Sequence, residues 1–421
     1  MLLDLEASEM AIRSSMHDIG GVILGNIVNA DGGGHKGPRI KCGNGHEADF
    51  IDYRVKELTT VLSAVKSKRA YYYCNSCGKG VIPKDQEMNV VRTSLSPGVR
   101  RMIGRVGGKE PFDEGSRDLE TLAGIAVKTK QVERVSEAIG RHIEAVSIKE
   151  RQAVMSGKLL SIETAAKLYI AIDGTGVPVV SRETEGRLGK GDDGRAKTRE
   201  AKLGCVFTQT TVDAEGRPVR DPVSTTYVGA IEPAAEFGRR IYAEAVRRGI
   251  ARACLVIVLG DGAPWIWNIA DLHFPGAIQI VDLYHAREHV NGLSKVLYGT
   301  SSKAGEWAKA VIDLLDEGNV EAVLARIARL RPNHKLAVDE VKKAIHYFQT
   351  NKERMRYRHF RSLALFVGSG VVEAGCKTII RRRFKQSGMR WTVTGANAII
   401  ALRCCELSGR WEDFWAEAAS A

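Results

Sequence analysis

The segment KLYIAIDGTGVPVV, residues 167–180, begins as an apolar run that ends at Asp173 and is followed by Gly174 and Gly176. A short apolar run bounded by glycines is typical of a buried strand. Because the residues beside the carboxylate are small, a metal ion and a phosphate group could approach Asp173 closely. The segment therefore predicts a central strand of an α/β sheet with a functional carboxylate at its end.

A second segment, ACLVIVLGDGAPWIW (253–267), repeats this arrangement. Its apolar run leads into Asp261, which has glycine on both sides, and Pro264 marks the start of a helix. Two further strand patterns and an amphipathic helix lie between the two runs: LGCVFTQTTV (203–212), STTYVGA (224–230) and EPAAEFGRRIYAEAVRRG (232–249). The order strand, strand, strand, helix, strand is the pattern of an α/β ribonuclease-H-like fold.

In a sheet of that fold the first and fourth strands are neighbours, so the two acids, 88 positions apart (261 − 173), would meet in space. A third carboxylate is expected in VVEAGCKTIIRRRFKQSGMRW (371–391), where Glu373 is the only acid. Three such carboxylates can hold two divalent cations about 3.5–4 Å apart for in-line phosphoryl displacement. The predicted catalytic and metal-binding residues are therefore Asp173, Asp261 and Glu373, with magnesium, or manganese in its place, as the ion.

The remainder of 371–391 is basic and apolar. In a helix, residues at i, i+4 spacing would form one charged stripe, which consists of Glu373, Lys377, Arg381 and Lys385. The neighbouring stripe would dock on the sheet, and it consists of Val372, Cys376, Ile380 and Phe384. The predicted contacts with the DNA backbone are Lys377, Arg381, Arg382, Lys385 and Arg390. The alternative is that Glu373 only pairs with Lys377, which is worth about 0.2–0.5 kcal/mol.

Two supporting residues are expected near the same edge of the sheet. AIQIVDLYHAREHV (277–290) is typical of a buried strand that passes into a helix, with Asp282 and His285 at the junction. These residues would contact the scissile phosphate or order Glu373, and the alternative for Asp282 is a helix N-cap or core role. The long span before Glu373 is largely of helical pattern, which predicts an all-helical insertion.

Four candidate zinc ligands occur as two close pairs, Cys42 with His46 and Cys74 with Cys77. The residues between the pairs have the pattern of a β-ribbon, and close pairs on two turns joined by strands are how a zinc ribbon assembles its tetrahedral site. His35 is an alternative to His46, and two unrelated thiol clusters are the alternative to a metal site. Ligand cysteines of this kind also indicate a reducing compartment.

A helix-turn-helix-like region is expected at 117–145, with a break between Gly124 and Thr129. Leu119, Leu122 and Ile125 are predicted to face inward on its first helix. Three basic residues near the start of its second helix would meet DNA: Lys128, Lys130 and Arg134. The alternative is a plain helical hairpin with a solvated basic face.

Composition sets the broad class of protein. A formal net charge of +12 and a pI near 9.3 favour nucleic acid as partner. The 44% hydrophobic and 27% charged residues are typical of a globular chain. Apolar runs are short, and the N-terminus MLLDLEASEM lacks the basic start of a secretory signal. We expect a cytoplasmic, nucleoid-associated protein with no membrane partner.

Six regions are expected. Their order is an N-terminal helix with a Gly-rich linker (1–40), a zinc-ribbon-like module (41–85), the helix-turn-helix-like DNA-binding region (86–160), the first part of a ribonuclease-H-like core (161–283), the helical insertion (284–360) and the C-terminal helices of the core (361–421).

Most of the chain resembles the insertion-sequence transposases of the ISKra group, which carry a DDE triad. The resemblance rests on long ordered motifs: CNSCGKGVIPKD, SPGVRRM, AGIAVKTKQVERVSEAIG, YIAIDGTGVP, REAKLGCVF, VLGDGAPWIWNIA, FPGAIQIVDLYHAREH, GSGVVEAGCKTIIRRRFKQSGMRW and GANAIIALR. It implies that the triad maps onto Asp173, Asp261 and Glu373, and a DxxH feature onto Asp282 and His285. The first ribbon pair departs from the cysteine-rich pattern of the group, because it contains His46.

The resemblance implies a DNA transposase that binds the terminal inverted repeats of an insertion sequence, cleaves the element ends and joins the 3′-hydroxyls to target DNA. Joining two ends implies a homodimer or a higher oligomer on DNA. Two alternatives stay open at this point. One is a ribonuclease-H-like nuclease that cuts DNA without strand transfer, and the other is a catalytically idle, zinc-containing DNA-binding protein.

Overall fold

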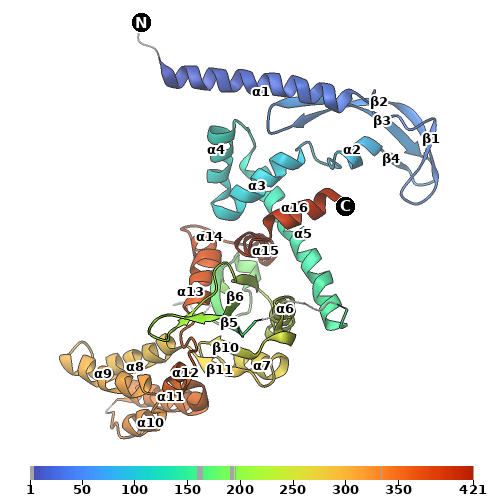
Figure 1. Ribbon diagram of the computed structural model, residues 1–421. Coiled ribbons are helices and arrows are strands. Elements are labelled where there is room, and N and C mark those ends of the chain that lie inside the picture. The colour runs from blue at the N-terminus through green and yellow to red at the C-terminus, as the bar shows by residue number, and fades with distance from the viewer. Residues whose placement is uncertain (1–3, 159–164, 190–193, 195, 333, 421) are drawn as a thin grey trace. The chain divides into compact units, whose positions relative to one another are not determined.

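The computed structural model describes residues 4–158, 165–189, 194, 196–332 and 334–420, so the predicted boundary between residues 160 and 161 lies outside the described part. The fold is mixed α/β (Figure 1). The chain divides into two compact units, one of Met1–Ile139 with Trp415–Ala421 and one of Gly140–Phe414. None of the described helices combines the length and apolar character that a membrane span requires.

An antiparallel ribbon organises the first unit. Its strands lie side by side in chain order: β1 (Arg39–Lys41), β2 (Glu47–Thr59), β3 (Ala64–Cys74) and β4 (Lys79–Val81). Helix α1 (Leu5–Asn29) packs along β3 (Figure 1). A side chain at Gly21 would collide with the hydroxyl of Ser63, so glycine permits this close approach. The ribbon predicted from the sequence is therefore present.

Short helix α2 (Pro83–Glu87) follows β4 and is tied to the ribbon by ion pairs. Asp85 accepts hydrogen bonds from Arg69 at 2.8 Å and from Lys56 at 3.2 Å. All three side chains are largely shielded from solvent, and buried charges of this kind are stable only when they are paired. The ion pairs therefore hold α2, which follows the last cysteine of the predicted zinc site, against the middle of β2 and β3.

Three helices complete the first unit and lead into the second: α3 (Pro97–Lys109), α4 (Phe112–Ala123) and α5 (Thr129–Met155). Their shared core contains Leu95, Val99, Ile103, Leu119, Ile125, Val127 and Val132. The break between α4 and α5 falls at the predicted place, where Gly124 adopts a left-handed conformation. The prediction that Leu122 faces inward is wrong, because its side chain is 71% exposed. The second helix is also much longer than predicted.

A five-stranded mixed sheet forms the centre of the second unit, in the order β11-β10-β5-β6-β9. The strands are β5 (Lys167–Pro178), β6 (Thr198–Gln209), β9 (Thr226–Ala230), β10 (Leu255–Gly260) and β11 (Ile278–Val281). β5, β10 and β11 run parallel to one another, and β6 runs antiparallel to both β5 and β9. The first and fourth predicted strands, now β5 and β10, are thus neighbours.

Small elements connect the strands of this sheet. They are η1 (Ser181–Glu183), β7 (Thr211–Val212), β8 (Pro218–Val219) and η2 (Ile250–Arg252). Helix α6 (Ala234–Arg247) lies between β9 and β10, α7 (Pro264–His273) follows β10, and α8 (Leu283–Tyr298) follows β11. The sheet strands are almost fully buried over Leu168–Ile172 and Ile257–Leu259, which is why their sequences are continuous apolar runs.

The region between α8 and Glu373 is helical, as predicted. It contains α9 (Ser302–Asp316), α10 (Val320–Ala328), α11 (Lys335–Asn351), η3 (Lys352–Met355) and α12 (Tyr357–Ser362), which gather beside β11 and β10 (Figure 1). The chain then continues through α13 (Gly370–Gly375), η4 (Cys376–Arg381), α14 (Arg382–Phe384), α15 (Val393–Leu407) and α16 (Trp411–Ser420).

The basic segment after Glu373 differs from the prediction in one respect. The predicted apolar stripe is buried, at Val372, Cys376, Ile380 and Phe384. However, the expectation of one regular α-helix is wrong, because η4 is a turn of π-helix between two short α-helical pieces. A π-turn inserts an extra residue into the helix and shifts the side chains that follow it, and such turns are frequent at functional sites.

Candidate active site and metal centre

Asp173 and Asp261 lie beside each other at the edge of the sheet where β10 ends. The prediction that Asp173 ends its strand is wrong, because β5 continues to Pro178 through its pairing with β6. Leu259 lies opposite Ala171 in the parallel register, and the two aspartates each follow two residues later. Adjacent strands are about 4.8 Å apart, so the two side chains start from neighbouring positions. The backbone N–H of Gly174 donates to Asp173 Oδ1 at 2.7 Å, and that of Ala263 donates to Asp261 Oδ1 at 2.8 Å.

Asp173 sits in an environment that disfavours its charge. Burial is the main cause that raises the pKa of Asp173, and the negative charge of Asp261 raises it further. A hydrogen bond from the Cys376 thiol and the nearby His285 act in the opposite direction. A buried carboxylate beside a second negative charge is stabilised by a bound cation. The edge therefore has the electrostatic character of a cation site.

Glu373 lies near this edge without completing it. Helix α13 packs on β5 and β6, and Glu373 stands one turn before Cys376, whose side chain contacts Asp173. The Glu373 side chain is 49% exposed. Its Oε1 forms an ion pair with Lys377 Nζ at 2.8 Å. Among the described residues the three acids do not form a group that could hold a metal ion as they stand. The ion pair considered as the alternative is thus formed.

Asp282 has a capping role and a second contact toward Glu373. Its Oδ1 accepts the backbone N–H of His285 at 2.9 Å at the start of α8. Its Oδ2 accepts the backbone N–H of Ser369, the residue that precedes α13. The side chain is only 2% exposed, so it cannot reach a phosphate. Asp282 instead fixes the beginning of the helix that carries Glu373.

Tyr347, from the helical insertion, holds the loop that carries Asp261 and was not anticipated from the sequence. Its hydroxyl donates to the Asp261 carbonyl at 3.1 Å, and its ring stacks on His289 with centroids 3.8 Å apart. Gly262 has φ +100, and a Cβ there would lie 2.7 Å from the Tyr347 ring. A glycine directly after the aspartate was the one sequence signal of this close approach.

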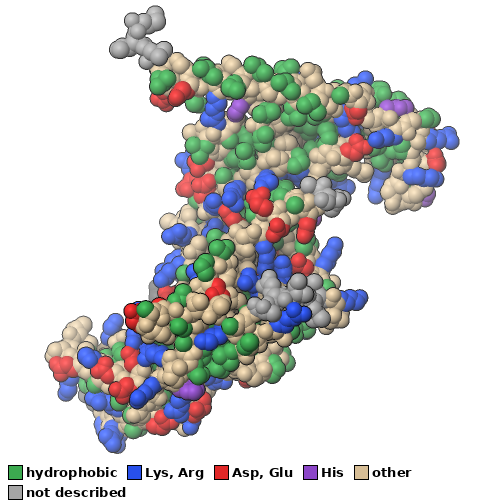
Figure 2. Space-filling model, in the orientation of Figure 1, with side chains coloured by type: hydrophobic (Ala, Val, Ile, Leu, Met, Phe, Trp, Pro, Cys, Tyr) green, Lys and Arg blue, Asp and Glu red, His purple; other side chains and the backbone are tan. Residues whose placement is uncertain are grey.

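The basic side chains that follow Glu373 differ in burial and in contacts. Lys385 Nζ donates to Thr175 Oγ1 at 2.7 Å, two residues beyond Asp173. Arg383 is completely buried, and its guanidinium lies 4.9 Å from the centre of the Trp391 ring. The other basic residues predicted to contact DNA are exposed, namely Lys377, Arg381, Arg382 and Arg390. Lysine and arginine side chains are spread over the face shown in Figure 2.

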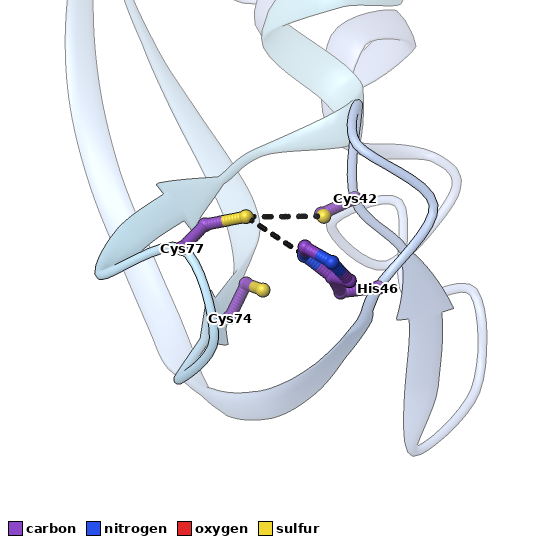
Figure 3. A group of neighbouring side chains, drawn as sticks. All are labelled: Cys42, His46, Cys74 and Cys77. Carbon is purple, nitrogen blue, oxygen red and sulfur yellow. Dashed lines mark hydrogen bonds between the residues drawn. The ribbon is translucent and has the colours of Figure 1, made fainter.

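The predicted zinc ligands converge in the first unit. One ligand atom from each of Cys42, His46, Cys74 and Cys77 lies within 4.8 Å of the others, and the side chains point toward one centre (Figure 3). Cys77 Sγ is 3.8 Å from Cys42 Sγ and 3.1 Å from His46 Nδ1. Three sulfur donors and one imidazole nitrogen are a ligand set that suits zinc.

Two turns of the ribbon position these ligands. The backbone N–H of Cys42 donates to the His46 carbonyl at 2.8 Å, which closes the first turn. Glycines with positive φ, Gly45 at +80 and Gly78 at +62, allow both turns to be tight. His35 is not part of the cluster, because its ring packs edge-on against Phe50 with centroids 4.7 Å apart. His46 is therefore the fourth member.

The three basic residues of the predicted helix-turn-helix-like region are exposed near the start of α5. Lys130 forms an ion pair with Glu133 at 2.7 Å, and the backbone N–H of Lys128 donates to the Gln131 side chain at 3.0 Å. Arg134 follows one turn after Lys130. On the ribbon, the Arg54 guanidinium lies 3.4 Å from the centre of the Tyr71 ring. Both surfaces offer cations to a polyanion.

The chain is similar to a curated protein and to solved structures, and no family model matches it. The chain is 21% identical over 380 residues to the "UPF0236 protein in vanSb 3′ region" of Streptococcus gallolyticus, covering 88% of this chain and 76% of that protein. It is also similar to the solved Drosophila P element transposase strand transfer complex, with 9% identity, a TM-score of 0.25, and coverage of 80% of this chain and 85% of that one. This structural likeness is too weak to establish a shared fold.

Proposed function

We propose that this protein is a DNA transposase whose second unit is a ribonuclease-H-like catalytic domain. The observation that carries the proposal is that Asp173, within β5, and Asp261, directly after β10, lie on neighbouring parallel strands. The strand order β11-β10-β5-β6-β9 and the motif resemblance to ISKra-group transposases support it. The net charge of +12 suits a DNA substrate.

Asp173, Asp261 and Glu373 are the residues that would hold divalent cations, magnesium or manganese. Such ions supply charge stabilisation at the phosphorus and lower the pKa of an attacking water. The repulsion between the two aspartates and the desolvation of Asp173 favour binding of cations at this edge. For Glu373 to join them, its carboxylate must leave Lys377. That lysine is then free to contact a DNA phosphate.

The proposed chemistry has two balanced displacements at phosphorus. Water first attacks a phosphodiester at the element end, and the bond to the 3′-oxygen breaks and leaves a 3′-hydroxyl. That hydroxyl then attacks a phosphodiester of target DNA. A bond from the element's 3′-oxygen to the target phosphorus forms, and the target's own bond to its 3′-oxygen breaks and leaves a target 3′-hydroxyl. Lys385, held at Thr175 beside Asp173, is placed to pair with a phosphate oxygen. The ribbon and helices α3–α5 are the proposed readers of the terminal repeats.

The zinc ribbon has a structural part in this proposal. The four ligands come from two turns at the same end of a ribbon. The ribbon has a small core, made of Cys42, Ala48, Ala70, Tyr72 and Cys74. A bound zinc ion would hold the two turns together and so fix the surface that meets DNA.

The test is a strand-transfer assay with purified protein, a labelled donor that carries a terminal repeat and a free 3′-hydroxyl, target DNA and Mg²⁺. We expect joined product from the natural chain and a loss of about a thousandfold for Asp173→Asn or Asp261→Asn. Leu272→Ala, on the exposed surface of α7, is the control and should leave joining unchanged. Cleavage without joining would identify a nuclease. DNA binding with neither reaction would identify an idle binding protein.

A further inference from the structure

Helix α1 carries a row of apolar side chains that none of the described residues covers. The face opposite this row packs on β3. The row runs the length of the helix, its members are between 55% and 67% exposed, and they are Leu5, Ile12, Met16, Ile19, Ile23 and Ile27. Figure 2 shows hydrophobic side chains along this helix. An exposed apolar row of this length on one helix marks an interaction surface.

The spacing of the row specifies a helix as partner. Residues 12, 16, 19 and 23 are separated by four, three and four positions, which is the alternation of a two-helix coiled-coil seam. Among the described residues, the other helices expose only scattered large apolar side chains, such as Leu122, Leu272 and Leu336. The described part of the chain therefore contains no second row to which α1 could fold back.

The charge of α1 argues against a polyanionic partner. The acidic residues are Asp4, the N-cap, and Glu6, Glu9 and Asp18 in the helix. Arg13 is the one arginine, so the net charge is −3. DNA and anionic lipid surfaces would be repelled. We propose that α1 pairs with α1 of a second copy of this chain. The proposal rests on this helix alone and does not depend on the catalytic function.

The sequence of the row also selects an antiparallel arrangement. In a parallel pair Glu9, which occupies a seam position between Leu5 and Ile12, would face its own copy, and like charges repel. In an antiparallel pair, seam residues whose numbers sum to 35 face each other. The layers are then Leu5 with Ala30, Glu9 with Asn26, Ile12 with Ile23, and Met16 with Ile19. Each apolar residue of these layers meets an apolar residue, and the one acid meets an amide. Ile27, level with Ser8, lies beside the seam.

The packing of α1 on the ribbon favours this association. A helix of 25 residues is about 37 Å long, and on its own it would lose considerable freedom on pairing. Here the side chain of Asn29 bonds to the backbone of Lys66 and Lys68 at 2.8 Å, so the end of α1 is fixed to β3. A partner that is already ordered binds at a lower entropic cost.

Sedimentation velocity of the full chain at micromolar concentration, without DNA or Mg²⁺, tests the proposal. We expect a particle of twice the 46.0 kDa chain mass. Ile12→Arg combined with Ile19→Arg should raise the dimer dissociation constant at least about a hundredfold, because four charges enter an apolar seam. Circular dichroism should show unchanged folding, because both side chains are exposed in the single chain.

Two controls keep the outcome clear. Leu272→Arg replaces an apolar residue that is 73% exposed on another helix and should leave the dimer intact. Asp173→Asn should do the same, so failure of catalysis is distinguishable from failure of dimerisation. A monomeric natural chain, or a double arginine variant that still dimerises, would overturn the proposal.

Cross-linking tests the orientation in a Cys254→Ser background. Equal amounts of Met16→Cys and Ile19→Cys chains, mixed and oxidised, should form a disulfide between the two variants, and either variant alone should not. If each variant instead forms a disulfide with its own copy and the mixture gains nothing, the helices are parallel and the antiparallel seam is wrong.

Discussion

The ribbon cluster and the acidic edge of the sheet are both candidate metal sites, but they are built in opposite ways. In the first, four ligands from residues 42–77 already lie within 4.8 Å of one another. In the second, Asp173 and Asp261 meet at the sheet edge while Glu373 is paired with Lys377. Thiols and imidazole can be neutral and pack together, whereas carboxylates repel until a cation arrives. The ribbon cluster is thus preformed, whereas the proposed catalytic site would assemble only when its cation binds.

The largest effect is expected from removing one ligand of the Cys/His cluster. Cys77→Ser should abolish binding of one zinc ion per chain and unfold the ribbon, because metal affinity in such modules is folding free energy of several kcal/mol or more. Metal content and hydrogen exchange of β2 and β3 measure the effect. Cys254→Ser removes an exposed cysteine outside the cluster and should change neither. A variant that keeps its protected ribbon would show that the cluster is not a structural zinc site.

An intermediate effect is expected from the two partners of the Glu373 ion pair. Glu373→Gln should lower strand transfer about a hundredfold or more, since it removes a proposed metal ligand. Lys377→Gln frees the carboxylate and should shift activity by no more than about tenfold, with half-maximal activity at a lower Mg²⁺ concentration. Titration of activity with Mg²⁺ measures both. Equal losses in the two variants would mean that Glu373 serves only to pair with Lys377.

The smallest effect concerns the pH dependence of stability without metal. Because the folded pKa of Asp173 is raised above its ordinary value of 3.8, the folded state binds the proton more tightly than the unfolded state. The contribution of Asp173 to the free energy of unfolding therefore increases as pH falls through its folded pKa toward 3.8, and it decreases as pH rises. Thermal unfolding at several pH values should show this gain in the natural chain and lose it in Asp173→Asn. Saturating Mg²⁺ should also remove it. A pH profile that Asp173→Asn leaves unchanged would mean that the aspartate is not destabilised at the edge.

Several features of both sites were readable from local sequence. The apolar runs ending at Asp173 and Asp261 predicted buried strands, and β5 and β10 are neighbours. The pairs Cys42 with His46 and Cys74 with Cys77 predicted the ligand cluster. These inferences succeeded because a strand's burial, and a turn's ligand spacing, depend on residues that are adjacent in the chain.

Other features depend on contacts between distant residues. Leu122 appears apolar and inward-facing in the sequence, yet it lies on the exposed side of α4. The π-turn η4 packs on β5, and no residue type in the segment predicts it. Tyr347 reaches the Asp261 loop across 86 positions. A sequence pattern reflects residues that are adjacent in the chain, so it does not reveal contacts between distant ones.

The amino-acid sequence alone determined which chemical groups this protein can use: three acids in glycine-flanked or basic surroundings, three cysteines with a histidine, and an excess of positive charge. The tertiary structure decided which of them meet. In the folded chain the four sulfur and nitrogen ligands lie close together, and the two aspartates lie at one sheet edge. Glu373 forms an ion pair with Lys377. The physical reason is that residue type sets charge and ligand softness, whereas distance, burial and repulsion exist only once the chain has packed.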